Sequence, residues 1–202
     1  MGSDQSVCFN LLFDMALPSS FISADHSTRH PTVGTAKRRR TEAACDTAPV
    51  TDRSFLCAEL ATTWQRDVPL ATAMSIGVES YDGKTLTVRA PLPPNRNLHG
   101  TAFAGSLFSV CVLTAWGAAW LAFREQGLSG LIMVTDSHVQ YRKAVTGDLV
   151  CHCTPDAGTL GAGLEQFRST GRASLSLACT IDVGDKCAVA FTGTYVVRAE
   201  LH

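Results

Sequence analysis

The sequence predicts an α+β domain in which an antiparallel sheet wraps around one long buried helix. Three observations predict this fold class. Residues 101–124 form an apolar stretch with no proline and no charge before Arg124. Two strand-like segments precede this stretch, and four follow it. Runs of strands around a single apolar helix favour an antiparallel sheet over a doubly wound parallel one.

Residues 1–52 are expected to form a flexible or disordered leader, and residues 53–202 the folded domain. The leader holds scattered Ser and Pro and the basic run 37–40, without strand alternation or a helical stripe. Its start fits the N-myristoylation pattern at Gly2, and Cys8 could take a second lipid. A Met-Gly-Ser start is also common without lipid, so membrane contact is expected only if the leader is lipidated.

The first element expected in the domain is a short amphipathic helix over residues 54–66. Leu56, Leu60 and Trp64 recur there near helical spacing. Ser54 precedes them and is the expected N-cap, because its side chain can accept a backbone N–H of the first turn.

A β-hairpin is expected next. Residues 72–81 alternate apolar and polar side chains, and residues 84–90 place Leu86 and Val88 on one face. Asp82-Gly83 between them is a hairpin turn signal. Three prolines follow and end the second strand.

The apolar stretch 101–124 predicts a helix buried on nearly all sides. A membrane-spanning helix is the alternative, but Ser and Thr interrupt the stretch and no basic flank precedes it. Gly127 is the expected end of the helix.

Four further strands are predicted after the helix, over residues 131–141, 148–154, 172–182 and 186–198. The tripeptide 183–185, Val-Gly-Asp, is a tight turn signal between the last two.

The composition excludes several classes of protein. The 202 residues carry 17 Lys and Arg against 18 Asp and Glu, a net charge of −1, which excludes nucleic-acid binding by bulk charge.

Eight cysteines are scattered, several inside apolar runs, as buried reduced thiols are. Without a signal-like start, an intracellular and cytoplasmic location is expected. Cys151-x-Cys153 has no second pair at zinc spacing, so neither a metal site nor a cofactor is expected.

The segment 95–107, NRNLHGTAFAGSL, is the main candidate for chemistry. It leads into the predicted helix, whose first N–H groups are unpaired and carry partial positive charge. Gly100 has no side chain to block these groups, so a carbonyl oxygen gaining charge could be held as in an oxyanion hole. One such donor contributes roughly 3 kcal/mol to transition-state stabilisation. The alternative is structural: Asn97 turns the loop, His99 is an ordinary loop histidine and Gly100 serves backbone geometry.

The residues around this segment resemble the thioesterase branch of the hot-dog fold. The similarity lies in the helix length, the strand order, the loop His99-Gly100-Thr101 and the segment 139–148, VQYRKAVTGD. The loop is most similar to the thioesterase domain found behind an acetyltransferase in some bacteria, the YiiD C-terminal type. The resemblance covers about residues 53–200.

The resemblance implies a homodimer or dimer of dimers with acyl-thioester sites at the subunit interface. The substrate would be an acyl-CoA or an acyl-carrier-protein thioester. Carried onto this chain, Asn97, His99, Gly100 and Thr101 would line the thioester. Phe103, Gly105 and Ser106 would contact the substrate, and helix N-terminal amides would hold its carbonyl oxygen.

One departure from the family pattern concerns the catalytic acid. Many hot-dog thioesterases carry a carboxylate in the second or third turn of the helix, but residues 105–110 contain none. Glu125 lies about 30 Å further along the helix, at 1.5 Å per residue, and is too distant to replace it.

A base must then come from elsewhere. His99 could act on water as a general base. Asp136 alternates with His138 on a strand expected to be central. In the family that the chain resembles this strand lies at the dimer seam, so Asp136 could reach a partner's loop. A solvent-facing surface carboxylate is the alternative for Asp136, and His138 is expected to be structural. Ser106 could orient water, although no G-x-S-x-G motif marks it as a nucleophile.

Three functions fit these residues. The first is a thioesterase that uses water, His99 or Asp136, and backbone amides at Gly100–Thr101. The second is a hydratase or dehydratase on the same fold, with His99 and Asp136 paired across a tunnel. The third is a non-catalytic acyl-CoA-binding protein that lacks the helix carboxylate.

Overall fold

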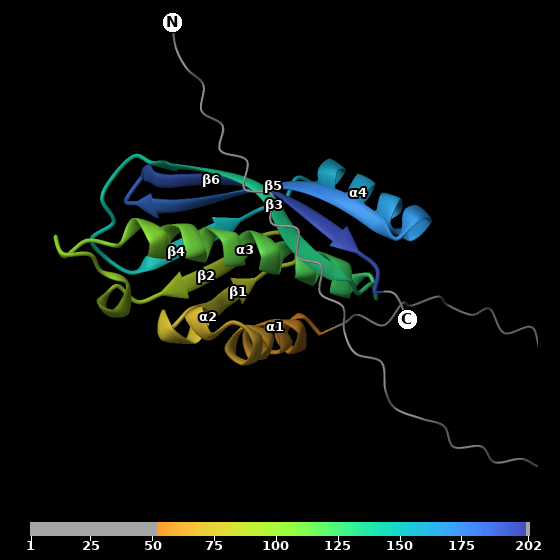
Figure 1. Ribbon diagram of the computed structural model, residues 1–202, viewed down its shortest axis with the longest axis horizontal. Helices are drawn as coiled ribbons and strands as arrows, with labels where there is room; N and C mark the ends of the chain where they lie inside the picture. The colour runs from red at the N-terminus through yellow and green to blue at the C-terminus, as the bar shows by residue number, and fades with distance from the viewer. Residues whose placement is uncertain (1–51, 201–202) are drawn as a thin grey trace, which may run out of the picture. The chain divides into compact units, whose positions relative to one another are not determined.

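The computed structural model describes residues 52–200 (Figure 1). The leader expected over residues 1–52, with the lipidation sites Gly2 and Cys8 and the basic run 37–40, lies outside the described residues apart from Asp52.

The domain begins with helix α1, Arg53–Asp67, as predicted. Leu56, Leu60 and Trp64 are its buried residues. The N-cap is Asp52, whose Oδ1 accepts the N–H of Ser54 over 2.9 Å. The prediction of Ser54 as the N-cap was therefore wrong by two residues. Ser54 instead donates its backbone N–H to the side chain of Asp52.

The strand predicted over residues 72–81 is correct only in its second half. Residues Pro69–Ala73 form the short helix α2, and strand β1 is Gly77–Tyr81. Pro69 lies at the first position of α2, where its fixed φ favours a helix and its missing N–H costs nothing. Met74 and Ile76 are buried in the connection, so their alternation reflects burial without a strand.

The hairpin after β1 is confirmed. Strand β2, Leu86–Ala90, pairs antiparallel with β1. In the turn, Asp82 Oδ1 accepts the N–H groups of Lys84 and Thr85 over 2.8 and 2.7 Å. Gly83 has φ of 93°, a conformation that side chains disfavour. The 3₁₀ helix η1, Pro93–Asn95, follows β2.

The long central helix is confirmed as α3, Ala104–Glu125. It begins three residues later than predicted and ends just before Gly127, which has φ of 66°. Twelve of its residues are buried, and the sheet curves around it (Figure 1). Its hydropathy would allow it to span a membrane, but 67% of the apolar window is buried inside the domain, as in a core helix.

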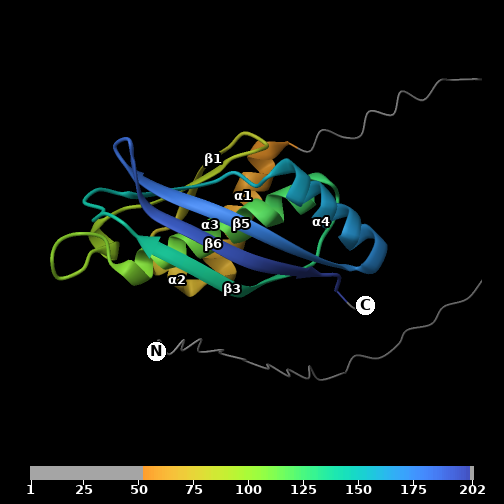
Figure 2. The same cartoon turned by 90° about the horizontal axis from the view of Figure 1, so that it is seen from above.

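The four strands predicted after α3 are confirmed as β3 Leu131–Tyr141, β4 Leu149–Cys153, β5 Arg172–Val183 and β6 Lys186–Arg198. They complete a six-stranded antiparallel sheet with the order β1-β2-β4-β5-β6-β3. Figure 2 shows β3 beside β6 at one side of the sheet. The expectation that β3 is a central strand was wrong within this chain: β3 is an edge strand. This sheet around one helix is the hot-dog fold expected from the sequence.

Helix α4, Ala157–Thr170, was not predicted. Three glycines inside it weaken its helical pattern. Tertiary contacts explain it: Gly163 allows close approach to Leu175 of β5, and Phe167 packs edge-to-face on Phe123 of α3 with ring centroids 5.1 Å apart.

Four cysteines lie in the core as free thiols, namely Cys111, Cys151, Cys153 and Cys179. The Sγ atoms of Cys111 and Cys151 are 3.8 Å apart. Hydrogen bonding with Cys151 and burial raise the pKa of Cys111. Within residues 52–200, no group of three His, Cys, Asp or Glu side chains is placed to hold a metal ion.

Candidate active site

The loop before α3 is anchored by Asn95. Its side chain is 1% exposed, and its Nδ2 donates to the carbonyl oxygens of Met74 and Pro91 over 2.8 and 2.7 Å. Its carbonyl oxygen accepts the N–H of Phe103 over 2.7 Å. Both ends of the loop are therefore tied to one buried residue.

Asn97 holds the loop itself together. Its Oδ1 accepts the N–H groups of His99 and Thr101 over 2.8 and 3.2 Å. Its Nδ2 donates to Thr101 Oγ1 and to the carbonyl oxygen of Ala102 over 3.0 and 3.3 Å. Gly100 sits in this turn with φ of 78°. Asn97 thus has the loop-organising contacts that the structural alternative expected, and His99 lies exposed near the tip.

The amides left without a partner before α3 are not those expected. Gly100 and Thr101 lie before the helix, and both donate their N–H groups to Asn97. The first helical residues are Ala104, Gly105 and Ser106, whose N–H groups precede the first intrahelical bond, donated by Leu107 to Phe103. The N–H groups that precede the first intrahelical bond of α3 are therefore those of residues 104–106, and Gly100 and Thr101 shape the loop in front of them.

Aromatic side chains border these three amides. Phe103 is 54% exposed, and its ring lies against Gly105, where any side chain would collide with it. Tyr141 of β3 donates its hydroxyl hydrogen to the carbonyl oxygen of Ala104 over 3.0 Å. Burial raises the pKa of Tyr141, so it remains a donor at neutral pH. The sequence segment 139–148 contained Tyr141, but no periodicity indicated that it reaches the start of α3.

The serines in the first turns of α3 differ in their contacts. Ser106 is 8% exposed and lies directly at the helix start. Ser109 donates its hydroxyl hydrogen to the carbonyl oxygen of Gly105 over 2.9 Å. Ser106 is thus the serine placed beside the unpaired amides.

The structure does not bring Asp136 to this loop. A register shift in β3 between Val134 and Asp136 places Asp136 opposite Thr194. Asp136 and His138 line a shallow polar hollow with Ser176, on the face of the sheet away from α3. Asp136 is therefore separated from the other expected site residues. Those lie together in the loop before α3 and in its first turn, and they are Asn97, His99, Gly100, Thr101, Phe103, Gly105 and Ser106.

Glu125 lies at the other end of α3, as the sequence indicated. Its carboxylate accepts hydrogen bonds from Arg53 Nε over 2.7 Å and from the Tyr81 hydroxyl over 3.0 Å. Glu125 is therefore engaged in holding α1 and β1 to the C-terminal end of α3.

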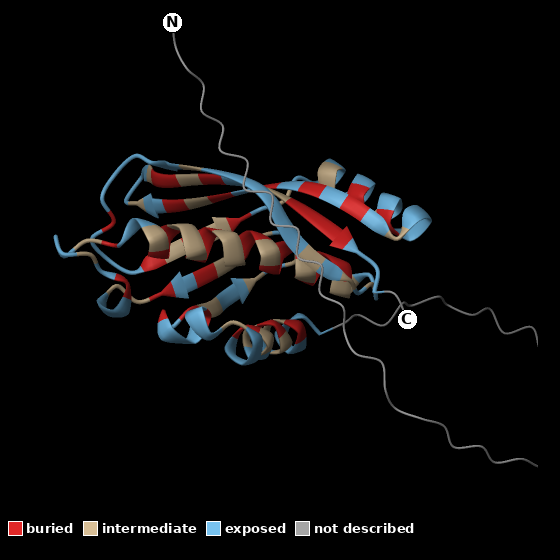
Figure 3. Ribbon diagram, in the orientation of Figure 1, coloured by how far each residue is buried: buried red, intermediate tan, exposed pale blue. Residues whose placement is uncertain are grey.

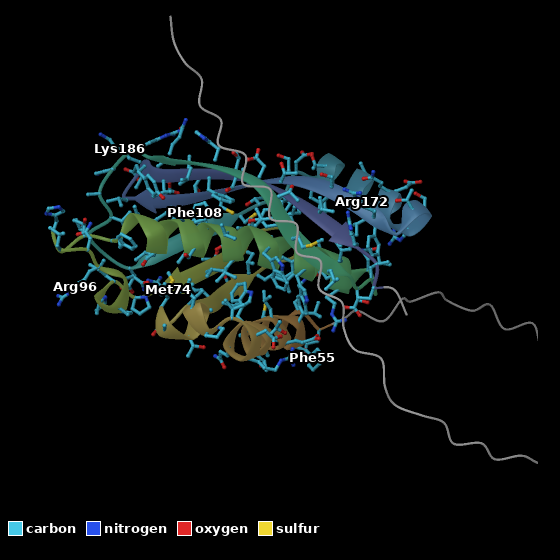
Figure 4. All side chains as sticks on the ribbon, viewed as in Figure 1. Phe55, Met74, Arg96, Phe108, Arg172 and Lys186 are labelled. Atoms are coloured by element: carbon cyan, nitrogen blue, oxygen red, sulfur yellow. The ribbon has the colours of Figure 1, made fainter. Side chains whose placement is uncertain are left out.

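Basic side chains surround the end of the domain where α3 begins. Arg142 and Lys143 directly follow Tyr141, and both donate their backbone N–H groups to the carbonyl oxygen of Ala188. Figure 4 labels Arg96 and Lys186 at the same end. All four are exposed, and the exposed carboxylates Asp182 and Asp185 lie in the turn beside Lys186.

Residues 57–199 match the family described as "Putative thioesterase (yiiD_Cterm)". A protein of unknown function from Chlorobaculum tepidum TLS is 30% identical, with a TM-score of 0.70 over 73% of this chain and 96% of that one. A putative thioesterase from Shewanella oneidensis is also 30% identical, with a TM-score of 0.64 over 72% and 98%. A thioesterase from Haemophilus influenzae, 11% identical with a TM-score of 0.55 over 72% and 93%, shares the fold.

The match spans the six strands, the central helix and the loop of Asn97. The sequence resemblance is thereby confirmed: the chain belongs to the putative thioesterase family of the YiiD C-terminal type, and it is a thioester hydrolase with the hot-dog fold.

Proposed function

We propose that this protein hydrolyses acyl-CoA thioesters, with the thioester carbonyl oxygen held by the amides at the start of α3. The observation that carries the proposal is the set of three N–H groups at Ala104, Gly105 and Ser106, ahead of the first intrahelical bond. Unpaired amides at a helix start stabilise developing negative charge. Phe103 and Tyr141 border them with apolar rings, which would limit competition from water.

His99 is the proposed general base. It takes a proton from water, the water oxygen bonds to the carbonyl carbon, and the carbon–sulfur bond breaks as the thiol leaves with that proton. The hydrogen bond from its own N–H to Asn97 Oδ1 fixes the backbone of His99 within the loop. Asp136 lies on the face of the sheet away from α3 of its own subunit, so as a base it could serve only the loop of a second copy.

Exposed basic side chains near the start of α3 favour CoA as the carrier. Arg142 and Lys143 follow Tyr141, which bonds to the first residue of α3, and Figure 4 shows Arg96 and Lys186 at the same end. CoA carries several phosphates near its far end. Arginine and lysine are the side chains that bind phosphate. An acyl-carrier protein is the second source of the same acyl thioester, and an assay on both carriers distinguishes them.

A homodimer is the proposed assembly. β3 offers an edge of 11 residues, most of them exposed, including Leu131 at 56% and Met133 at 43%. Such an edge is a template for pairing with another strand. Pairing with the β3 of a second copy would satisfy its backbone groups, and two such dimers could associate further.

A second candidate function is acyl-CoA binding without turnover. It is favoured by one observation: from Ala104 to Arg124, helix α3 contains no carboxylate. A protein with this function would bind acyl-CoA at the same amides and release no thiol.

The test is thiol release from a panel of acyl-CoAs and the matching acyl-carrier proteins. Wild type is compared with Asn97→Ala, His99→Ala and Asp136→Ala, each checked for the wild-type oligomer by gel filtration. The proposal predicts turnover that falls strongly in His99→Ala and is unchanged in Asp136→Ala. Saturable acyl-CoA binding with no thiol release in wild type would favour the binding protein instead.

A further inference from the structure

The half-buried apolar and small side chains of α3 lie on one stripe of the helix. They recur every three or four residues, so they share one face. Figure 3 shows this stripe in tan along the helix. Its members are Gly105, Phe108, Ser109, Val112, Leu113, Trp116 and Trp120. The stripe starts at the proposed oxyanion site and continues along most of the helix.

An apolar cavity of about 240 Å³ opens on the middle of this stripe. Helix α3 contributes Val112, Leu113 and Trp116 to its wall. Trp64 of α1 and Val134 of β3 close two other sides. Seven of the nine residues that line the cavity are aliphatic or aromatic, and the other two are Thr63 and Asp67, so most of the wall suits a hydrocarbon chain.

The cavity has rigid walls. Trp116 donates its indole N–H to the carbonyl oxygen of Ile132 over 3.0 Å, which ties α3 to β3. Tyr195 donates its hydroxyl hydrogen to the carbonyl oxygen of Val112 over 2.9 Å. Trp64 is 1% exposed and packs against Gly117. A wall held by such bonds sets a size limit, because it cannot widen without breaking them.

We propose that this cavity receives the distal half of a medium-chain acyl group, and that it sets the chain-length specificity of the enzyme. This inference rests on the proposed function. Val112 and Trp116 lie six and ten residues beyond Ser106, or about 9 and 15 Å along the helix at 1.5 Å per residue. An extended chain advances about 1.25 Å per carbon–carbon bond, so an acyl chain held at the amides needs about eight to thirteen carbons to reach these two residues.

The acyl chain is the favoured occupant because the stripe connects the cavity to the amides that would hold its carbonyl. A side chain from a second copy at the β3 edge is the competing occupant. Blocking the cavity distinguishes the two occupants. If the acyl chain occupies it, the enzyme should prefer a shorter acyl chain. If a side chain of a second copy occupies it, only the dimer should be disturbed.

The test fills the cavity from β3. Val134→Trp places a large side chain in it, while Met133→Trp is the matched control, because neighbouring strand residues point to opposite faces. Thiol release is measured for acyl-CoAs of increasing length, and gel filtration reports the oligomer. We expect wild type and Met133→Trp to share one optimum in the medium range. Val134→Trp should lose about tenfold or more of its kcat/KM for decanoyl-CoA and keep that for butyryl-CoA, since each buried methylene contributes about 0.8 kcal/mol.

A binding measurement keeps the inference testable without turnover. The chain has three tryptophans, and two of them, Trp64 and Trp116, line the cavity. In a Trp120→Phe variant, 10-bromodecanoate should quench the remaining fluorescence more strongly than 2-bromodecanoate, because bromine quenches on contact.

The outcomes separate the inference from the proposed function. If no thioester is hydrolysed but 10-bromodecanoate quenches more strongly, the catalytic proposal fails and the cavity assignment stands. Equal quenching by the two isomers, or identical chain-length profiles for Val134→Trp and Met133→Trp, would overturn the inference.

Discussion

Tyr141 donates its hydroxyl hydrogen to the carbonyl oxygen of Ala104 over 3.0 Å, which joins the end of the edge strand β3 to the first turn of α3. The two residues are far apart in the chain, and their contact fixes the helix start relative to the sheet edge. The contact therefore links the sheet edge to the turn that carries the amides at residues 104–106.

Replacing Tyr141 by Phe should lower the turnover of acyl thioesters several-fold, because the helix start loses its tie to β3. The free energy of unfolding should fall by only about 1 kcal/mol, the usual net contribution of one hydrogen bond. Tyr81→Phe is the matched control, since its hydroxyl bonds Glu125 at the opposite end of α3. Equal losses of turnover in the two variants would contradict a specific role for Tyr141.

Replacing Asn97 by Ala should lower turnover by about tenfold or more, because it removes every side-chain bond that Asn97 makes within the loop of His99. Asn97→Asp keeps the acceptor for the N–H groups of His99 and Thr101 and loses the donors, so its activity should be intermediate. Steady-state kinetics on the two variants, with circular dichroism to confirm folding, provides the check. Full activity in Asn97→Ala would show that the loop geometry does not matter.

Replacing Gly100 by Ala should destabilise the protein by roughly 1–2 kcal/mol, the cost of a side chain in the left-handed region. Gly100 has φ of 78°, and no atom lies within 4 Å of the position that a Cβ would take there, so backbone strain is the whole effect. Gly147→Ala has the same free space without the positive φ and serves as control. Urea unfolding of both variants measures the difference, and equal midpoints would contradict the prediction.

Two glycines of α4 should respond to alanine with opposite signs. Gly161 has open space around it, so Gly161→Ala should stabilise the helix by up to about 1 kcal/mol. Gly163 faces the Leu175 side chain, and Gly163→Ala should destabilise by roughly 1–3 kcal/mol through overpacking. Thermal unfolding reports both. Stabilisation by Gly163→Ala would mean that Leu175 moves aside at no cost.

Asp156 should make part of the stability dependent on acid pH. Hydrogen bonds from the N–H and hydroxyl of Thr159 lower the pKa of Asp156 in the folded state. A lowered folded pKa contributes stability above the unfolded value, about 3.9, and this contribution is lost as the pH falls through the folded value. Asp156→Asn keeps a capping acceptor without the titration.

Melting temperatures of wild type and Asp156→Asn at neutral pH and below about pH 4 provide the measurement. The melting temperature of wild type should fall further on acidification than that of Asp156→Asn. Parallel losses in the two proteins would mean that the cap carboxylate does not contribute to the acid sensitivity.

The sequence by itself determined the main elements of the fold. The apolar stretch 101–124, the four strands after it and the turns at Asp82-Gly83 and 183–185 were all predicted, because burial on all sides and alternation along a strand leave periodic patterns. The family resemblance carried by the loop 97–101 and the segment 139–148 also came from residue types at fixed spacings.

Only the tertiary structure decided which groups meet. Helix α4 has local caps at Asp156 and Gly171, but its glycines interrupt the helical pattern, and the contacts of Gly163 and Phe167 hold it against β5 and α3. The register shift in β3 turned Asp136 away from α3. Asn97 accepts the N–H groups of Gly100 and Thr101, so the amides without a partner are those of residues 104–106. Register and hydrogen-bond partners depend on residues distant in the chain, and a local pattern contains no information about them.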